Sequence, residues 1–168
     1  MPLVLRKIKK AKWYKNVVVP WLKKGELQAD ALTDLKTTNN RLSVWLVQND
    51  KSNLDRIITA LASTCEYLTN IDFALLDQSI LEQLDIKWEK TKGDSHDDVI
   101  NQTNHLDLIE LTATKLYQFA HKIQTNGTMT RYLEKKVINL VIEAIRIGRI
   151  AKNRLNEKIQ RRIRDIHN

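Results

Sequence analysis

The last forty residues, 129–168, carry a long apolar periodicity, and this feature constrains the fold most strongly. Apolar residues recur there at steps that are almost all three or four, and no proline interrupts them. That spacing keeps one stripe of a 3.6-residue helix facing a core. The pattern therefore predicts a very long last helix. Within it, Gly148 indicates either a bend or a close approach of another backbone.

Similar spacing predicts three further helices, over residues 54–68, 72–84 and 105–124. The pair Asn126-Gly127 would end the last of these, since glycine readily takes the backbone conformation of a helix terminus. Segment 105–124 and segment 129–168 should then form an antiparallel hairpin. The expected fold class is mainly α, a helical bundle built around this hairpin.

The pattern of the first fifty residues predicts a small β element that packs on that bundle. Residues 3–8 and 16–22 are predicted to be extended, residues 25–35 are predicted to form a short helix, and residues 42–47 are the best strand candidate. The chain then divides into an N-terminal α+β element, residues 1–50, and a helical domain, residues 51–168. A polar stretch at 87–104 predicts a surface loop within the second part.

The composition is typical of a folded protein and argues against several classes of protein. The chain has 168 residues, of which 42% are hydrophobic and 29% charged, enough for one folded core. No apolar run reaches the length of a membrane span and the N-terminus lacks the apolar centre of a secretory signal, so a cytoplasmic location is expected. With one cysteine, no Gly-rich phosphate loop and no zinc-type spacing, neither a disulfide nor a cofactor is expected.

The net charge of +8 is concentrated at the two ends of the chain. Residues 1–24 hold eight Lys or Arg and no acid, and residues 129–168 hold eleven against four Asp or Glu. The middle, residues 25–128, is acidic, with nine basic against sixteen acidic residues. This separation predicts an anionic partner for the basic ends. Alternatively, the ends fold against the acidic middle and cancel its charge.

Phosphate contacts are expected from lysines near the N-terminus and from the polar face of the last helix, because guanidinium and ammonium groups match phosphate oxygens. Trp13, among the lysines, would either stack on a base or plug the local core. The candidate nucleic-acid-binding residues are Lys9, Lys10, Lys12, Trp13, Lys15, Arg146, Arg149, Arg154, Lys158, Arg161 and Arg164.

Two other features of the sequence could take part in chemistry, a cluster of acids and histidines and the single cysteine. Six acids and imidazoles fall between residues 94 and 107, but without regular ligand spacing, so no metal site is predicted; they are Asp94, His96, Asp97, Asp98, His105 and Asp107. Cys65 lies on the apolar stripe of its helix and is expected in the core.

Arg162 and His167 form an Arg-x4-His pair at the end of the chain. This spacing resembles the active-site motif of HEPN-type ribonucleases, which are small all-helical proteins. The resemblance covers that motif alone. It implies that one residue would stabilise charge on a phosphodiester and the other transfer a proton.

The leading functional expectation is a non-catalytic nucleic-acid-binding or adaptor subunit of a larger intracellular assembly, contacting an RNA or DNA backbone through both basic ends. The alternatives are a small ribonuclease that uses Arg162 and His167 and a module that binds an acidic protein partner. A basic amphipathic helix lying on an anionic membrane surface is a further alternative.

Overall fold

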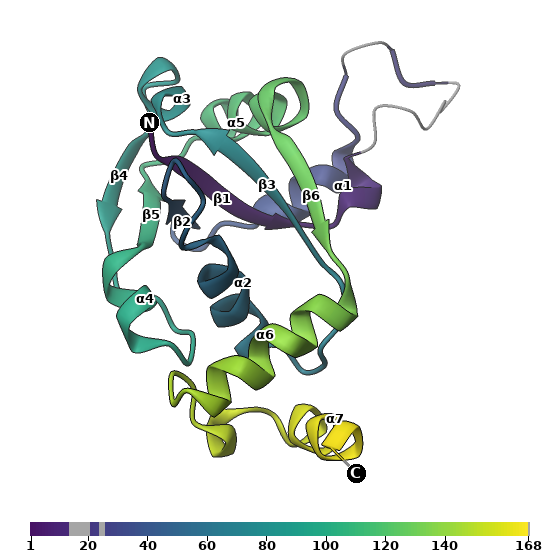
Figure 1. Cartoon of the computed structure of the whole chain (residues 1–168). Coiled ribbons are helices and arrows are strands. Elements are labelled where there is room, and N and C mark those ends of the chain that lie inside the picture. The colour runs from purple at the N-terminus through teal and green to yellow at the C-terminus, as the bar shows by residue number, and fades with distance from the viewer. Residues whose placement is uncertain (14–20, 24–25, 168) are drawn as a thin grey trace.

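The computed structural model describes residues 1–13, 21–23 and 26–167, and within these ranges it leaves the side chains of Lys10 and His167 undescribed. Its centre is a six-stranded sheet in the order β4-β5-β2-β1-β3-β6, with every neighbouring pair antiparallel (Figure 1). The strands are β1 (Leu3–Ile8), β2 (Leu42–Val47), β3 (Ile71–Asp77), β4 (Lys87–Lys90), β5 (His105–Ile109) and β6 (Thr128–Tyr132).

Seven described helices and three short 3-10 turns connect these strands. The helices are α1 (Ala29–Leu32), α2 (Leu54–Ser63), α3 (Ser79–Gln83), α4 (Asp98–Thr103), α5 (Ala113–Asn126), α6 (Glu134–Arg146) and α7 (Glu157–His167). The 3-10 turns are η1 (Lys10–Lys12), η2 (Thr33–Leu35) and η3 (Lys152–Arg154).

The sheet is covered by helices on both faces, so the core has two halves. Successive residues of a strand point to opposite faces. In β1, Leu5 therefore packs under α2, α6 and α7, whereas Val4 packs under α1, α3 and α5. In Figure 1, α5 lies above the strands and α2, α6 and α7 lie below them. The result is a three-layer arrangement of helices, sheet and helices.

The predicted mainly α helical bundle is wrong. Residues 71–77 and 105–109, expected within helices, are strands β3 and β5. Periodicity failed at β3 because four consecutive residues, 73–76, are buried, and a short apolar run does not distinguish a buried strand from a buried helix. The predicted strands 3–8 and 42–47 are confirmed as β1 and β2. Most of the extended stretch predicted at 16–22 lies outside the described residues.

The very long last helix and its hairpin with 105–124 are also wrong. Strand β6 separates α5 from α6, and α6 ends at Arg146. Gly148 neither bends a continuing helix nor packs against one: its φ of +74° lies in the left-handed region and turns the chain away. The amide of Arg149 donates to the carbonyl of Ala144 at 2.8 Å, which closes the helix end. Helix α7 starts ten residues after Ile147.

The polar stretch 87–104 is more structured than the predicted loop, because it contains β4 and α4. Asp97 begins α4 by accepting a hydrogen bond from the amide of Ile100, and its carboxylate pairs with Arg56 of α2 at 2.7 Å. Across the described ranges, no helix combines the length and the apolar composition that would let it cross a membrane.

Candidate functional site

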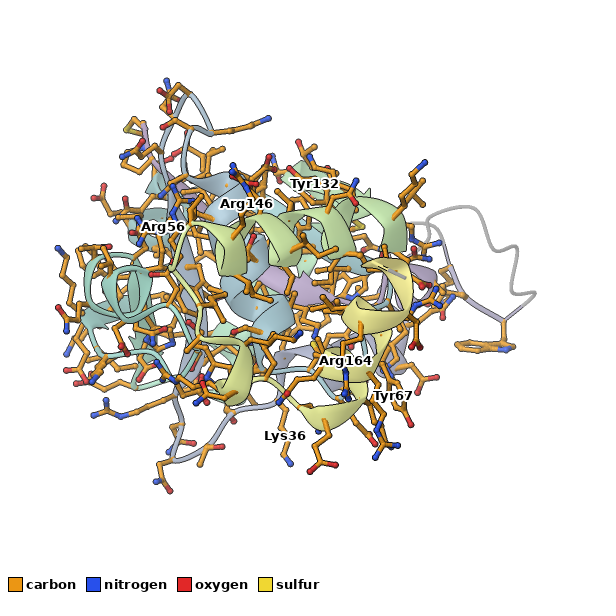
Figure 2. The ribbon with its side chains drawn as sticks, turned by 60° about the horizontal axis from the view of Figure 1, so that its bottom comes forward. Lys36, Arg56, Tyr67, Tyr132, Arg146 and Arg164 are labelled. Carbon is orange, nitrogen blue, oxygen red and sulfur yellow. The ribbon has the colours of Figure 1, made fainter. Side chains whose placement is uncertain are left out.

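The basic residues of the C-terminal segment do not share one helix face, because the segment is divided between α6, η3 and α7. Figure 2 shows Arg146 on α6 well away from Arg164 on α7. Most of the predicted contact residues there meet a carboxylate. The ion pairs are Arg146–Glu143 at 2.7 Å, Arg154–Asp98 at 3.4 Å, Arg161–Glu157 at 3.8 Å and Lys158–Glu66. Arg149 and Arg164 are exposed and, among the described residues, form no ion pair.

Near the N-terminus, Asp34 organises the predicted lysine segment. Its Oδ2 accepts from the Lys9 amide at 2.7 Å and from Trp13 Nε1 at 2.8 Å, and its Oδ1 lies 3.4 Å from Lys12 Nζ. Trp13 is only 1% exposed, so its indole fills the core and is not placed to stack on a base. Lys9 remains exposed. The side chain of Lys10 and all of Lys15 lie outside the described residues.

Three adjoining depressions connect the two basic ends. The first, of about 580 Å³, is lined by residues 6–9 of β1 and beyond, by β2 and β5, and by residues 92–94. The second, of about 210 Å³, shares residues 7–9 with the first and extends over residues 67–69. The third, of about 430 Å³, shares residues 67–69 with the second and ends against α7. We call this continuous feature the β1–α7 groove.

The groove holds Lys9 from the N-terminal prediction, and Lys158 and Arg161 from the C-terminal one. It leaves out Arg146, Arg149, Arg154 and Arg164, which line none of its three depressions. The predicted set is therefore only partly brought together.

Four residues of the groove were missed by the sequence analysis: Arg6, Lys7, Tyr67 and Lys92. Two adjacent charged residues inside a predicted strand were the available signal for Arg6 and Lys7. For Tyr67 and Lys92 no spacing in the sequence points to a site, because the fold alone brings them beside β1.

Tyr67 lines the second and third depressions, and the residue is 53% exposed. Lys158 Nζ is 4.4 Å from the ring centroid and 2.5 Å from the hydroxyl oxygen. Hydrogen bonds with Glu66 and Tyr67 raise the pKa of Lys158. Figure 2 shows Tyr67 beside α7. An exposed ring flanked by a cation offers a flat apolar surface next to a positive charge.

Arg6 carries a charge that main-chain carbonyl groups hold in place. Its Nε and Nη2 donate to the carbonyl oxygen of Asp34 at 3.0 and 2.6 Å, and Nη1 donates to the carbonyl of Ser43 at 2.7 Å. These acceptors are neutral main-chain groups. Burial lowers the pKa of Arg6, and the nearby charge of Asp34 opposes that effect. A guanidinium held this way favours a further anion.

The acidic residues of the groove are mostly engaged by cations. Asp34 meets Lys12, Asp72 meets Arg131 at 2.6 Å, Asp107 lies 3.9 Å from Arg41, and Glu134 lies 3.3 Å from Arg162. Among the described ion pairs none includes Asp94 or Asp165, and none includes Arg6, Lys7, Lys9 or Lys92. The unpaired groups of the groove are therefore four cations and two carboxylates.

The described ranges hold no group of three or more His, Cys, Asp or Glu side chains that could bind a metal. Within the stretch 94–107, Asp97 is committed to Arg56 and His105 packs edge-to-face on Trp45, with ring centroids 5.0 Å apart. Cys65 is half-buried, and its Sγ lies 3.4 Å from Lys7 Nζ.

The Arg-x4-His pair has no described geometry. Arg162 forms an ion pair with Glu134 at 3.3 Å, and the side chain of His167 lies outside the described residues.

Comparison with known proteins identifies no relative: no family model matches the chain, and neither a curated protein nor a solved structure shows significant similarity to it.

Proposed function

We propose that this protein is a non-catalytic nucleic-acid-binding protein that holds a single-stranded segment along the β1–α7 groove. The observation that supports this most strongly is that three neighbouring depressions share lining residues in succession, from the end of β1 to α7. Along the groove lie cations from two segments more than 140 residues apart in the sequence, such as Lys9 and Arg161.

The chemistry of the groove suits a single strand. Such proteins combine a positive track for phosphates with aromatic rings on which bases stack, and each stacked base is worth about 1–3 kcal/mol. Here Tyr67 would supply the ring, and Lys7, Lys9 and Lys92 would supply cations without a described carboxylate partner.

The ion pairs at the α7 end do not prevent phosphate contacts. The pairs of Lys158, Arg161 and Arg162 are all between side chains at least 45% exposed. Exposed pairs of this kind contribute only about 0–1 kcal/mol, because water and salt screen them. A phosphate could therefore replace the carboxylate at small cost.

Binding of fluorescently labelled 12-nucleotide RNA and DNA, single- and double-stranded, should be measured by anisotropy across a salt series. Single strands should bind more tightly than duplexes, and the logarithm of the affinity should fall with the logarithm of salt by about 0.7 per phosphate contact. Tyr67→Ala and Lys9→Gln should each weaken binding several-fold, while Arg146→Gln, a surface change outside the groove, should not.

Three results would count against the proposal. They are absence of binding at low salt, equal effects of the groove and control variants, and tighter binding of poly-glutamate than of any strand. The last result would favour an acidic protein partner. Monitoring the length of the RNA in the same samples tests the ribonuclease alternative, in which cleavage would require His167.

A further inference from the structure

The first depression of the groove differs from the other two in its larger volume and in the charged side chains that line it. It occupies about 580 Å³ at the point where β1, β2 and β5 lie side by side. Ligand pockets are commonly about 300–1,000 Å³, so this cavity is large enough for one nucleotide. The groove continues from it past residues 7–9 toward α7, which places the cavity at one end of the groove.

More cations without a described ion pair line this cavity than line either of the other two depressions. Its acidic walls, Asp34 and Asp107, accept hydrogen bonds from Trp13 and Ser43 and lie near Lys12 and Arg41. What remains without a described ion pair is one carboxylate, Asp94, against the four cations Arg6, Lys7, Lys9 and Lys92. A ligand with a single negative charge would leave most of these cations without a counter-charge.

A buried histidine adds a directed polar group. His105 is 6% exposed and lines the cavity. Its Nδ1 lies 2.8 Å from the hydroxyl of Thr91, and in the described part of the chain Nε2 makes no hydrogen bond. When the Thr91 hydroxyl donates to Nδ1, Nε2 carries the proton and can donate to an oxygen of a ligand in the cavity.

We propose that this cavity binds the phosphomonoester end of the strand, the terminal phosphate together with its nucleotide. A terminal phosphate carries about 1.5–2 negative charges near neutral pH and offers three acceptor oxygens. An internal phosphodiester carries one negative charge. The dianion therefore fits a cavity with several unpaired cations and a histidine better than an internal phosphate does. This inference rests on the proposed function, because the strand's remaining nucleotides occupy the rest of the groove.

The test compares three 12-nucleotide single strands of one sequence, with a 5′-phosphate, a 3′-phosphate or hydroxyls at both ends. One of the two phosphorylated strands should bind at least fivefold more tightly than the hydroxyl-ended strand. That strand also identifies which end the cavity takes. Lys92→Gln should abolish the gain, so that the phosphorylated and the hydroxyl-ended strands bind this variant equally. The matched control is Lys90→Gln, an exposed lysine of β4 that does not line the cavity.

The outcomes separate the two proposals. Equal binding of all three strands, with Tyr67→Ala still weakening each, overturns the terminal-phosphate inference and leaves the proposed function intact. A phosphate-dependent gain that Lys92→Gln and Lys90→Gln reduce equally also overturns it, since the gain would then reflect net charge. Failure of every strand to bind removes both proposals.

Discussion

At the scale of single residues, Gly93 shows how closely the cavity wall is packed. A Cβ at this position would lie 2.9 Å from Asn101 Oδ1, 2.9 Å from the Trp45 ring and 3.3 Å from His105 Cβ. Asn101 is itself held by hydrogen bonds with Ser95, at 2.7 Å from Nδ2 to the carbonyl, so it has little freedom to move aside. The absence of a side chain at position 93 is thus a requirement of packing.

Gly93→Ala should therefore destabilise the protein by about 1–2 kcal/mol, the usual range for overpacking a well-filled site. The free energy of unfolding from urea titration measures this. Lys92→Ala serves as the control, because it changes an exposed neighbour and should stay within about 0.5 kcal/mol. Equal stability of Gly93→Ala and the wild type would mean that the wall can relax.

Single-residue contacts also explain why Trp13 is buried in the core. An aromatic residue among lysines is compatible with base stacking and with core packing, and the choice depends on what its indole N–H finds. Here Asp34 provides the acceptor, 2.8 Å away, and the ring is buried. The aromatic residue placed for stacking is instead Tyr67, which no lysine flanks in sequence.

At the scale of elements, the pair between Arg56 of α2 and Asp97 at the start of α4 joins two helices. Both oxygens of Asp97 accept from the guanidinium, at 2.7 and 2.8 Å. Burial opposes ionisation of the carboxyl. Even so, hydrogen bonds from Arg56 and the Ile100 amide, with the charges of Arg56 and Arg149, hold the pKa of Asp97 below its ordinary value.

Stability should accordingly fall in acid. Because the pKa of Asp97 is lower in the folded than in the unfolded state, the unfolded state binds more protons as the pH falls below about 5. The stabilisation is complete above the unfolded value of about 3.9 and is lost as the pH falls through the folded value. Urea titrations from pH 7 to pH 2 should show a shallower decline for Asp97→Asn than for the wild type.

Asp97→Asn should also cost about 1–3 kcal/mol at pH 7, the range for hydrogen bonds to a charged group. Asp98→Asn is the matched control, since Asp98 is exposed and meets Arg154 only at 3.4 Å. If the two variants showed the same pH profile, Asp97 would not be the group responsible for the loss of stability in acid.

At the scale of the whole molecule, the fold brings the two basic ends onto one groove although the chain termini themselves lie at opposite ends of the view in Figure 1. Lys9, at the end of β1, and Arg161, on α7, line different depressions of the groove. A bound 12-nucleotide strand would contact both of these cations, whereas a bound dinucleotide would contact only one of them.

Lys9→Gln and Arg161→Gln should each weaken 12-nucleotide binding by about threefold, and the double variant by about ninefold, because separate contacts add in free energy. A dinucleotide should respond to one of the two changes only. The anisotropy assay gives both results. Sensitivity of the dinucleotide to both variants would show that the two cations act at one place, contrary to an extended path.

The amino-acid sequence alone was enough to predict those helices and strands whose apolar pattern or flanking turn residues were clear. Short, largely apolar runs were enough to predict β1 and β2 as extended, with flanking turn residues as the signal for β2, and apolar steps of three and four were enough for α2. It also determined that positive charge gathers at both ends of the chain. These properties depend on interactions between residues that are close in the sequence, so the sequence pattern is enough to predict them.

Three strands depend on long-range pairing and could not be predicted from local sequence; they comprise residues 71–77, 105–109 and 128–132. Their hydrogen-bond partners lie far away in sequence, as with Leu5 opposite Leu75 and Trp45 opposite His105. The same pairing helped to build the groove, because it placed β1 beside β2 and β2 beside β5, and all three line the first depression together with residues 92–94. In β3 and β5, burial on both faces of the sheet hides the alternation that marks a strand, whereas β6 is an edge strand without a buried residue, and its sequence does not show that it pairs with β3.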